Sequence, residues 1–190
     1  CRDHKTYLLA GGKDQLALPS AFYNTAFVIG PNGQIVFKQA KSVPVQFFAD
    51  GLPAASQALW ESPWGKLGVC ICYDLSYSTT VDPLVALGAE ALLVPTCDVI
   101  DWGDFEHRLH ARVAPSRAAE YGIPIFRLCS SGISQLVNAE GLVLADAPFP
   151  GQGEMLHGRL PLSKRGRIPF DRPVAWLGVG VSVLLFVWMY

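Results

Sequence analysis

The sequence lacks an excess of charge, because its 190 residues carry 15 Lys and Arg against 16 Asp and Glu. This balance gives no electrostatic reason to expect nucleic acid or a charged surface as a partner. Paired Cys-x-x-Cys spacing is also missing and the cysteine count is odd, so neither a disulfide framework nor a zinc knuckle is indicated. There are no internal repeats or low-complexity tracts. These absences favour one domain with free thiols and a small or apolar partner.

Charge is missing again from the last 18 or so residues, which are mostly apolar. That length is about what crosses a bilayer, and Trp176, Trp188 and Tyr190 lie near its ends as interfacial aromatics do. The alternative, a surface helix of a soluble domain, would show polar residues every few positions. We therefore expect residues 173–190 to be a transmembrane helix in the cell membrane, joined to the domain by a basic linker over residues 163–172.

Strand-like and helix-like segments alternate before that run. Strands are expected over residues 6–10, 24–29, 34–37, 66–71, 91–95, 123–128, 133–137 and 142–145. Helices are expected over residues 81–87 and 105–121, each stopped by the glycine that follows. This order predicts an α/β layered domain over residues 1–162, in which helices cover a mixed sheet and hairpins continue it.

Cys72 lies at the end of one expected strand, where α/β sheets place reactive groups because the carboxyl edge opens on the binding crevice. An inert core thiol is the commoner fate of a cysteine in an apolar run. Cys70 is the example of such a thiol, and its spacing predicts the same sheet face as Cys72. Position alone therefore leaves both interpretations of Cys72 open.

The surrounding residues favour a reactive thiol. Gly68 and the run Ile71-Cys-Tyr-Asp74 resemble the nucleophile motif of the nitrilase or carbon–nitrogen hydrolase superfamily. Residues 23–33, 117–124 and 131–141 resemble that superfamily's first hairpin, helix end and following hairpin, in the same order. The resemblance implies an αββα nitrilase-like sandwich. Because the chain opens on Cys1 without an initiator methionine, we expect the N-terminal part of that sandwich to be missing.

The same resemblance implies a Glu-Lys-Cys triad, in which the Cys72 thiolate attacks a carbonyl or nitrile carbon and forms a covalent thioester. An ordinary thiol is mostly protonated at neutral pH, so it requires a base or a cation to become a nucleophile. Lys41 would stabilise the thiolate and the oxyanion, with the backbone N–H of Tyr73 as a second donor.

The position of the lysine depends on which residue anchors the register. Counting eight residues from the turn glycine Gly33 selects Lys41, whereas anchoring on Pro44 would put Gln39 in its place. We prefer Lys41 because a hairpin strand fixes register better than a loop does. Lys38 is the second choice.

The acidic residues that the resemblance implies are harder to assign than Cys72 and Lys41. No glutamate here can be assigned as the general base, so we expect it upstream of this chain, which would then be unable to complete a turnover. Asp50 is the nearest substitute for a second glutamate of the family's loop. Asp74 and Asp98 are expected to bond loop N–H groups, and Asp98 could also border the site.

The helix expected over residues 105–121 carries two further signals. His107-x-x-His110 with Asp104 suggests a metal on one helix face, but a third strong ligand is not placed, and we expect neither metal nor cofactor. Trp102-Gly103 followed by His107 resembles one branch of the superfamily, the apolipoprotein N-acyltransferases. Trp102 and His107 are therefore expected to line the pocket, the alternative being a charged outer helix face.

Water and an amine compete for one acyl-enzyme, so the nucleophile motif does not separate hydrolysis from acyl transfer. We expect a membrane-anchored carbon–nitrogen hydrolase-type enzyme acting on a small amide or acyl substrate. Apolipoprotein N-acyltransferase activity, from phospholipid to a lipoprotein amino group, is the first alternative, and an inactive homologue that only binds is the second. Basic residues before the helix favour a cytoplasmic domain, whereas the acyltransferase resemblance favours the opposite side.

Overall fold

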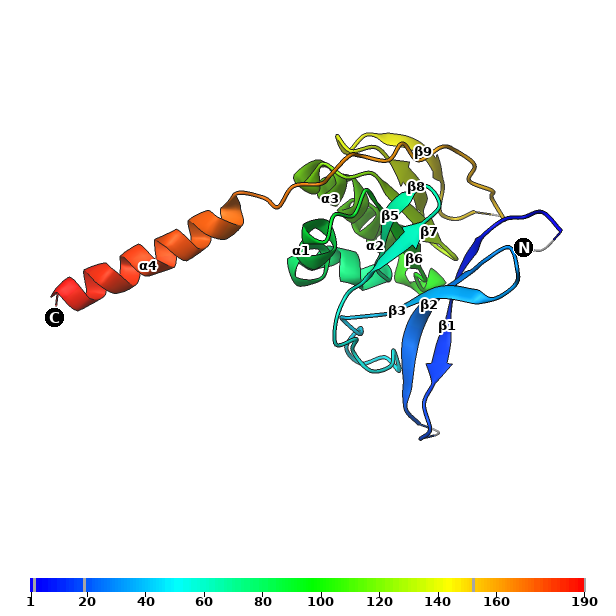
Figure 1. Cartoon of the computed structure of the whole chain (residues 1–190), viewed down its shortest axis with the longest axis horizontal. Coiled ribbons are helices and arrows are strands. Elements are labelled where there is room, and N and C mark those ends of the chain that lie inside the picture. The colour runs from blue at the N-terminus through cyan, green and yellow to red at the C-terminus, as the bar shows by residue number, and fades with distance from the viewer. Residues whose placement is uncertain (2, 19, 152, 190) are drawn as a thin grey trace.

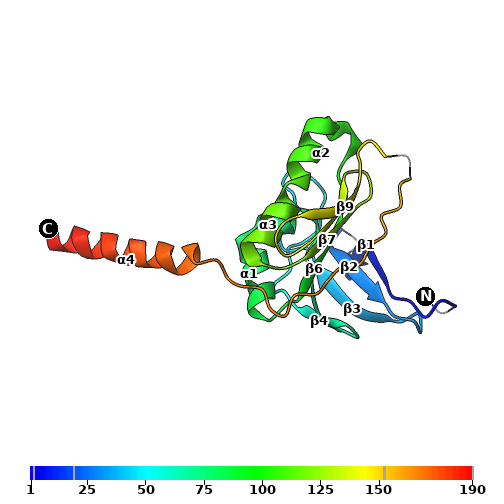
Figure 2. The same ribbon diagram turned by 90° about the horizontal axis from the view of Figure 1, so that it is seen from above.

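The computed structural model describes residues 1–190 except residues 2, 19, 152 and 190. Two β-sheets pack face to face, and helices cover the other face of the larger sheet (Figures 1 and 2). The smaller sheet consists of β1 (Leu8–Gln15), β2 (Phe22–Ile29) and β3 (Ile35–Ala40). The larger sheet has the order β4 (Leu59–Ser62), β5 (Gly65–Val69), β6 (Ala91–Thr96), β7 (Ile125–Cys129), β8 (Ser134–Val137) and β9 (Val143–Ala147).

The smaller sheet is antiparallel, and its β2–β3 hairpin closes through the expected turn, where Gly33 has a φ of 77°. The first strand is longer than expected. Gly11 and Gly12 were expected to end it, because glycine weakens strands, but β1 pairs with β2 as far as Gln15 opposite Phe22. Cross-strand pairing overrides the local preference there.

The larger sheet is mixed, as predicted. β5, β6 and β7 run parallel, while β4, β8 and β9 pair antiparallel at the two sides. Strand β4 was not expected from the sequence. Gly68 is needed inside β5, because a Cβ there would lie 2.6 Å from Leu92 Cδ2.

The core lies on both faces of the larger sheet because side chains alternate along its strands. Cys70, Leu92 and Val94 face the helices. Val69 and Leu93 face the smaller sheet.

Three helices cover the first of these faces: α1 (Ser78–Ala86), α2 (Gly103–Ala111) and α3 (Val113–Tyr121). The single helix expected over residues 105–121 is wrong, since two helices meet at Arg112. Pro115 explains the break, because it lacks an N–H and its ring opposes the carbonyl of residue 111. Gly122 ends α3 in the left-handed conformation with a φ of 64°.

The described residues therefore form three layers, helices, sheet and sheet, in a mixed α/β arrangement. The outer face of the smaller sheet carries no helix from the described part of the chain, so the second helical layer of the expected αββα sandwich is not seen here. Leu8, Ile35 and Val36 of this sheet are exposed.

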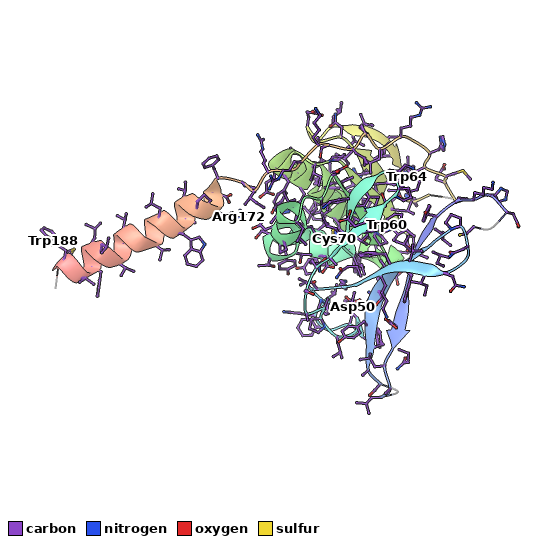
Figure 3. All side chains as sticks on the ribbon, viewed as in Figure 1. Asp50, Trp60, Trp64, Cys70, Arg172 and Trp188 are labelled. Carbon is purple, nitrogen blue, oxygen red and sulfur yellow. The ribbon has the colours of Figure 1, made fainter. Side chains whose placement is uncertain are left out.

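After β9 the described residues form no helix or strand until α4 (Asp171–Met189), which extends away from the domain (Figure 1). The stretch expected to be a linker contacts the domain, since Ser163 N donates to Glu90 O at 3.0 Å. Arg172, at the start of α4, pairs with Asp82 at 3.2 Å and with Glu120 at 3.0 Å (Figure 3). Helix α4 begins two residues before the expected position 173, and Tyr190 lies outside the described residues.

Candidate functional site

Cys72 lies beyond the carboxyl end of β5, at the first residue of a short 3-10 helix, η1 (Cys72–Ser76). Its φ of 53° is in the left-handed region, which residues with a Cβ seldom adopt. Such a conformation costs roughly 1–3 kcal/mol and persists only where neighbouring contacts hold it. The chain therefore turns sharply at Cys72 and carries the side chain away from the direction that the strand would have given it.

This turn separates the two neighbouring thiols. Cys70 is fully buried in the core between the larger sheet and the helices. Cys72 packs instead with Ala26 and Val69, on the side of the smaller sheet. The expectation that both thiols share one face is wrong, because period-2 alternation stops where the backbone turns at Cys72.

Asp74 holds this turn. Its fully buried carboxylate accepts the Ile71 N–H at 3.0 Å, within the turn. It also accepts the Ser42 N–H at 3.0 Å and the Val43 N–H at 2.7 Å, from the loop after β3. The predicted bonding of loop N–H groups by Asp74 is confirmed, and one side chain joins the two loops that carry Cys72 and Lys41.

Lys41 directly follows β3, and its backbone N–H donates to Asn24 O at 2.8 Å. Its side chain is 2% exposed, and Nζ lies 2.5 Å from Asp50 Oδ2. Asp50 also accepts from Asn24 Nδ2 at 2.6 Å and from the Val45 N–H at 2.8 Å. Although burial raises it, these hydrogen bonds hold the pKa of Asp50 below its usual range.

The side chains of the two other candidates for the lysine position, Lys38 and Gln39, lie elsewhere. Lys38 is largely exposed and pairs with Asp14 at 2.5 Å. Gln39 is buried, but its amide bonds Ser56 O at 3.1 Å and the Ala58 N–H at 3.0 Å. Lys41 is thus the one of the three whose side chain reaches the cavity beside Cys72.

A cavity of about 810 Å³ opens beside Cys72. It lies at the carboxyl ends of β5, β6 and β7, where parallel strands open onto binding crevices. Its lining is mostly apolar and includes Cys72, Lys41, Asp50 and Trp102, together with Phe48. Among the described residues, no glutamate lines it. Its volume suits a small ligand or part of a longer acyl chain.

The thiol in this cavity rests protonated. Burial, the largest cause, and the charge of Asp98 both raise the pKa of Cys72, and the net pKa is about 11. Lys41, Arg127 and the backbone N–H of Cys97 act in the opposite direction. Because a thiolate is the nucleophile, the reaction requires a group that takes the proton from Cys72.

Two of the expected site residues lie outside the cavity lining. The Tyr73 side chain is 37% exposed and packs edge-on against Tyr77, with ring centroids 5.0 Å apart. His107 is fully buried and stacks on Phe149 at 3.7 Å. Both His107 ring nitrogens lack a hydrogen-bond partner among the described residues. The backbone N–H of Tyr73 stays a prediction as an oxyanion donor.

Asp98 was expected to bond loop N–H groups and to border the site, but its carboxylate bonds Arg127 and His110 instead, in a buried charge cluster that the sequence did not predict. Asp98, fully buried after β6, lies 2.7 Å from Arg127 Nη2 of β7 and accepts from His110 Nδ1 of α2 at 2.8 Å. Burial raises the pKa of Asp98, but His110 and Arg127 more than offset this and leave it well below the usual range. An arginine inside an otherwise apolar strand was the signal in the sequence, because a charge buried there requires a partner.

This cluster also offers metal-ligand atoms. The Cys72 sulfur, an Asp98 oxygen and a His110 nitrogen all lie within 4.8 Å of one another. However, Arg127 and His110 already engage both oxygens of Asp98, and the guanidinium charge opposes a cation at the same place. The donor set does not fit a metal ion, and we assign none.

Known proteins similar to this chain include several apolipoprotein N-acyltransferases. The one from Rhizobium rhizogenes is 31% identical over 160 residues, which cover 70% of this chain and 29% of the relative. The one from Rhizobium etli is 34% identical over 155 residues, 67% of this chain and 28% of the relative. A deaminated glutathione amidase from Dictyostelium discoideum is 30% identical over 147 residues, 66% of this chain and 50% of the relative. The chain thus spans less than a third of the length of these two acyltransferases.

Solved structures show the same fold. A Nesterenkonia amidase of the nitrilase superfamily superposes with a TM-score of 0.68 at 23% identity, over 77% of this chain and 59% of that chain. A carbon–nitrogen hydrolase from Helicobacter pylori gives 0.68 at 20% identity, with the same coverage of 77% and 59%. The sequence itself matches the carbon–nitrogen hydrolase family over residues 1–169. On this match, and on the fold, the chain belongs to the carbon–nitrogen hydrolase family.

Proposed function

We propose that this chain carries the nucleophile of a membrane-anchored enzyme that cleaves or transfers an acyl group through a thioester on Cys72. The observation that supports this best is the strained turn that presents Cys72 beside the buried Lys41 at a largely apolar cavity. A nucleophile held out of the regular strand, next to a cation, is what acyl transfer by a thiol requires.

In the proposed reaction, the Cys72 sulfur attacks the acyl carbonyl carbon, and a sulfur–carbon bond forms as the oxygen becomes an oxyanion. Lys41 and the backbone N–H of Tyr73 stabilise that charge. The tetrahedral intermediate then expels the leaving group, which takes up a proton, and leaves the thioester. Water or an amine attacks the thioester and restores the thiol. Among the described residues that line the cavity, there is no glutamate to serve the leaving group.

Membrane attachment is proposed through α4. Within this helix of 19 residues, an 18-residue window has a mean hydropathy of 1.6, and none of that window is buried. An exposed apolar helix of this length would be costly in water and is long enough to span a bilayer. We propose a domain over residues 1–162, a basic segment over 163–172 held to the domain at Arg172, and a membrane helix over 173–190 in the cell membrane.

Among substrates, we favour acyl transfer from phospholipid to a lipoprotein amino group over hydrolysis of a soluble amide. The membrane helix and the similarity to apolipoprotein N-acyltransferases support this choice. So does the exposed side chain of Phe48, which lines the cavity, and so do those of Phe47 and Ile100, which directly adjoin the lining residues Phe48 and Val99 in sequence. Amide hydrolysis is the second proposal, which the similarity to an amidase supports.

The nucleophile is tested by labelling the purified chain, in detergent, with an iodoacetamide probe and mapping the modified peptides. We expect labelling at Cys72 that is lost in Cys72→Ala and kept in Cys70→Ala. Unchanged labelling in Cys72→Ala, with loss in Cys70→Ala, would contradict the assignment.

The reaction is tested with the purified chain in detergent, incubated with a diacyl phospholipid. Intact-protein mass spectrometry should show one acyl group on Cys72, and adding a lipopeptide with a free α-amino group should move that group to the peptide. Loss of the acyl group to water alone would favour the hydrolase. Failure of phospholipids and simple amides alike to acylate Cys72 would indicate a binding homologue.

A further inference from the structure

The short helix η1, which begins at Cys72, is held at its other end by Arg117 of α3. Arg117 Nε donates to Leu75 O at 3.0 Å, and Nη2 donates to Ser76 O at 2.6 Å. These carbonyls belong to the last two residues of η1, and the last carbonyls of a helix have no partner within it. Because a 3-10 helix rises about 2 Å per residue, Leu75 lies only about 6 Å along η1 from Cys72. The guanidinium therefore fixes the end of the same helix whose first residue carries the thiol.

The Glu120 carboxylate joins Arg117 to the start of α4. One oxygen, Oε2, pairs with Arg117, and the other, Oε1, lies 3.0 Å from Arg172 Nη2. Arg172 is the second residue of α4, and Figure 3 shows it where that helix meets the domain. One carboxylate thus connects the guanidinium at η1 with the guanidinium at the base of the apolar helix.

Arg172 is also bonded to two helices of the domain. Its Nε lies 3.2 Å from Asp82 Oδ2 of α1, and its Nη2 donates to Tyr121 Oη of α3 at 3.2 Å. The hydroxyl of the fully buried Tyr121 donates in turn to Asp82 Oδ1 at 2.5 Å. The side chains of the two arginines and of Asp82 and Glu120 are only 19–28% exposed, so salt screens these pairs less than it would at an open surface.

We propose that Arg172 couples α4 to the turn at Cys72 through Glu120 and Arg117, which makes Arg117 a positioning residue for the nucleophile. The proposal rests on the proposed functions of Cys72 as the nucleophile and of α4 as the membrane helix. In this arrangement, the helix that the bilayer holds is joined to the element that carries the thiol. The thiol then keeps a fixed position relative to the membrane surface, from which an acyl chain would come.

The strained backbone at Cys72 explains why a restraint at the far end of η1 matters. A φ of 53° persists only where neighbouring contacts hold it. Asp74 supplies such contacts from the loop after β3, and Arg117 supplies them from the helical layer. Loss of either should let the turn relax and move the sulfur relative to Lys41. A simple attachment of the last helix to the domain would have no such effect.

The test measures the rate at which p-nitrophenyl butyrate acylates Cys72 in the full chain in detergent, with the thioester located by mass spectrometry. Arg117→Met should lower that rate by about 10², the cost of a displacement of about 1 Å at the reacting group. Arg172→Met should lower it by about 10-fold, within the range for a residue that acts through others. Arg159→Met, at an exposed arginine between β9 and α4, is the matched control and should leave the rate unchanged.

The double variant tests the path of the coupling. If Arg172 acts through Glu120 and Arg117, its loss should have no further effect once Arg117 is replaced. The double variant should then be as slow as Arg117→Met, within a factor of about 2. Two effects that multiply would overturn the coupling, and a wild-type rate in Arg117→Met would overturn the positioning role.

Cys70 reports whether each variant is folded, because this thiol is fully buried in the core next to the helices. It should resist iodoacetamide in every variant. Where Arg117→Met exposes it, Arg117→Lys replaces that variant, since lysine keeps the charge but cannot bond both carbonyls as the planar guanidinium does. A folded Arg117→Lys variant with the wild-type rate would equally overturn the positioning role.

Hydrogen exchange tests the coupling without a substrate. Arg172→Met should speed amide exchange in the peptide that covers residues 72–77, whereas Arg159→Met should not. Exchange there at the wild-type rate in Arg172→Met would overturn the coupling. If the ester does not acylate Cys72 in the wild-type chain, the proposed function fails; if it acylates Cys72 at a rate indifferent to both arginines, only the coupling fails.

Discussion

Asp74→Asn is the most informative single substitution, because it keeps the volume of a fully buried side chain and removes one of its two acceptor oxygens. Oδ1 accepts from Val43 and Ser42, while Oδ2 accepts from Ile71 and, at 3.2 Å, from the shared Ser42 N–H. In either orientation of the amide, its NH₂ group faces a backbone N–H that donates to the carboxylate in the wild-type chain, so two donors face each other. The variant thus weakens either the turn at Cys72 or its connection to the loop after Lys41.

The magnitude follows from these contacts. A hydrogen bond to a charged group contributes about 1.5–3 kcal/mol, and a buried N–H left without an acceptor costs about 1–3 kcal/mol. Burial offsets part of this loss, since it raises the pKa of Asp74 despite three backbone hydrogen bonds, and a neutral amide avoids that penalty. We expect a net loss of about 2 kcal/mol, or roughly 4–8 °C in Tm for a domain of this size. The turn at Cys72 should also relax, and a displacement of about 1 Å at the nucleophile costs about 10² in the rate of thioester formation.

Urea unfolding followed by tryptophan fluorescence gives the first number, and the rate of Cys72 acylation gives the second. Asp104→Asn is the matched control, because the same chemical change at a side chain 54% exposed, paired only with Arg108, should cost less than about 0.5 kcal/mol. If Asp74→Asn is as stable and as fast as Asp104→Asn, the conclusion that Asp74 holds the turn is refuted.

Three other outcomes are expected. Lys41→Met should lower the rate of Cys72 acylation by about 10²–10³, the usual effect of losing one oxyanion donor, and a rate within a factor of 2–3 of wild type would contradict it. Asp98 has a folded-state pKa below its usual value, so its contribution to stability is present above about pH 4 and is lost as the pH falls. The urea midpoint should therefore drop more steeply from pH 5 to pH 3 in the wild-type chain than in Asp98→Asn. Gly68→Ala should cost about 1–3 kcal/mol by overpacking against Leu92, lowering the urea midpoint with an unchanged slope, and an unchanged midpoint would contradict the packing.

The sequence predicted those parts of the fold that depend on local patterns. Apolar runs located β5, β6 and β7, and turn residues located both hairpins. The elements that were not predicted correctly depend on non-local pairing or on a local interruption of the backbone. Strand β4 is short and exists by pairing with β5, while the division of the helix at Arg112 follows from a proline that the apolar spacing does not reveal.

The site was predicted less completely, because its contacts join residues far apart in the chain. Register counting found Lys41, and the motif found Cys72, but neither revealed that Asp74 links their two loops across about thirty residues. On α2, the residue pattern selected His107 as a pocket residue and indicated His110 only as part of a metal motif. Only the packing of α2 against the end of β6 shows that His110 lies at hydrogen-bond distance from Asp98.

The strained φ of Cys72 and the buried carboxylates beside it have a common physical explanation. A residue kept in the left-handed region costs free energy that the surrounding contacts must supply, and three backbone hydrogen bonds to Asp74 are well placed to do so. A carboxylate removed from water is in turn stable only with its own donors, and each one here has several. Asp74 accepts from backbone N–H groups, and Asp50 accepts from Lys41 and Asn24. Asp98 accepts from Arg127 and His110. Each arrangement stabilises a different part of the site: the turn, the cation and the buried charge cluster. It follows that substitutions at the three aspartates should act in distinguishable ways, through the geometry of Cys72 at Asp74, through oxyanion charge at Asp50 and through the pH dependence of stability at Asp98.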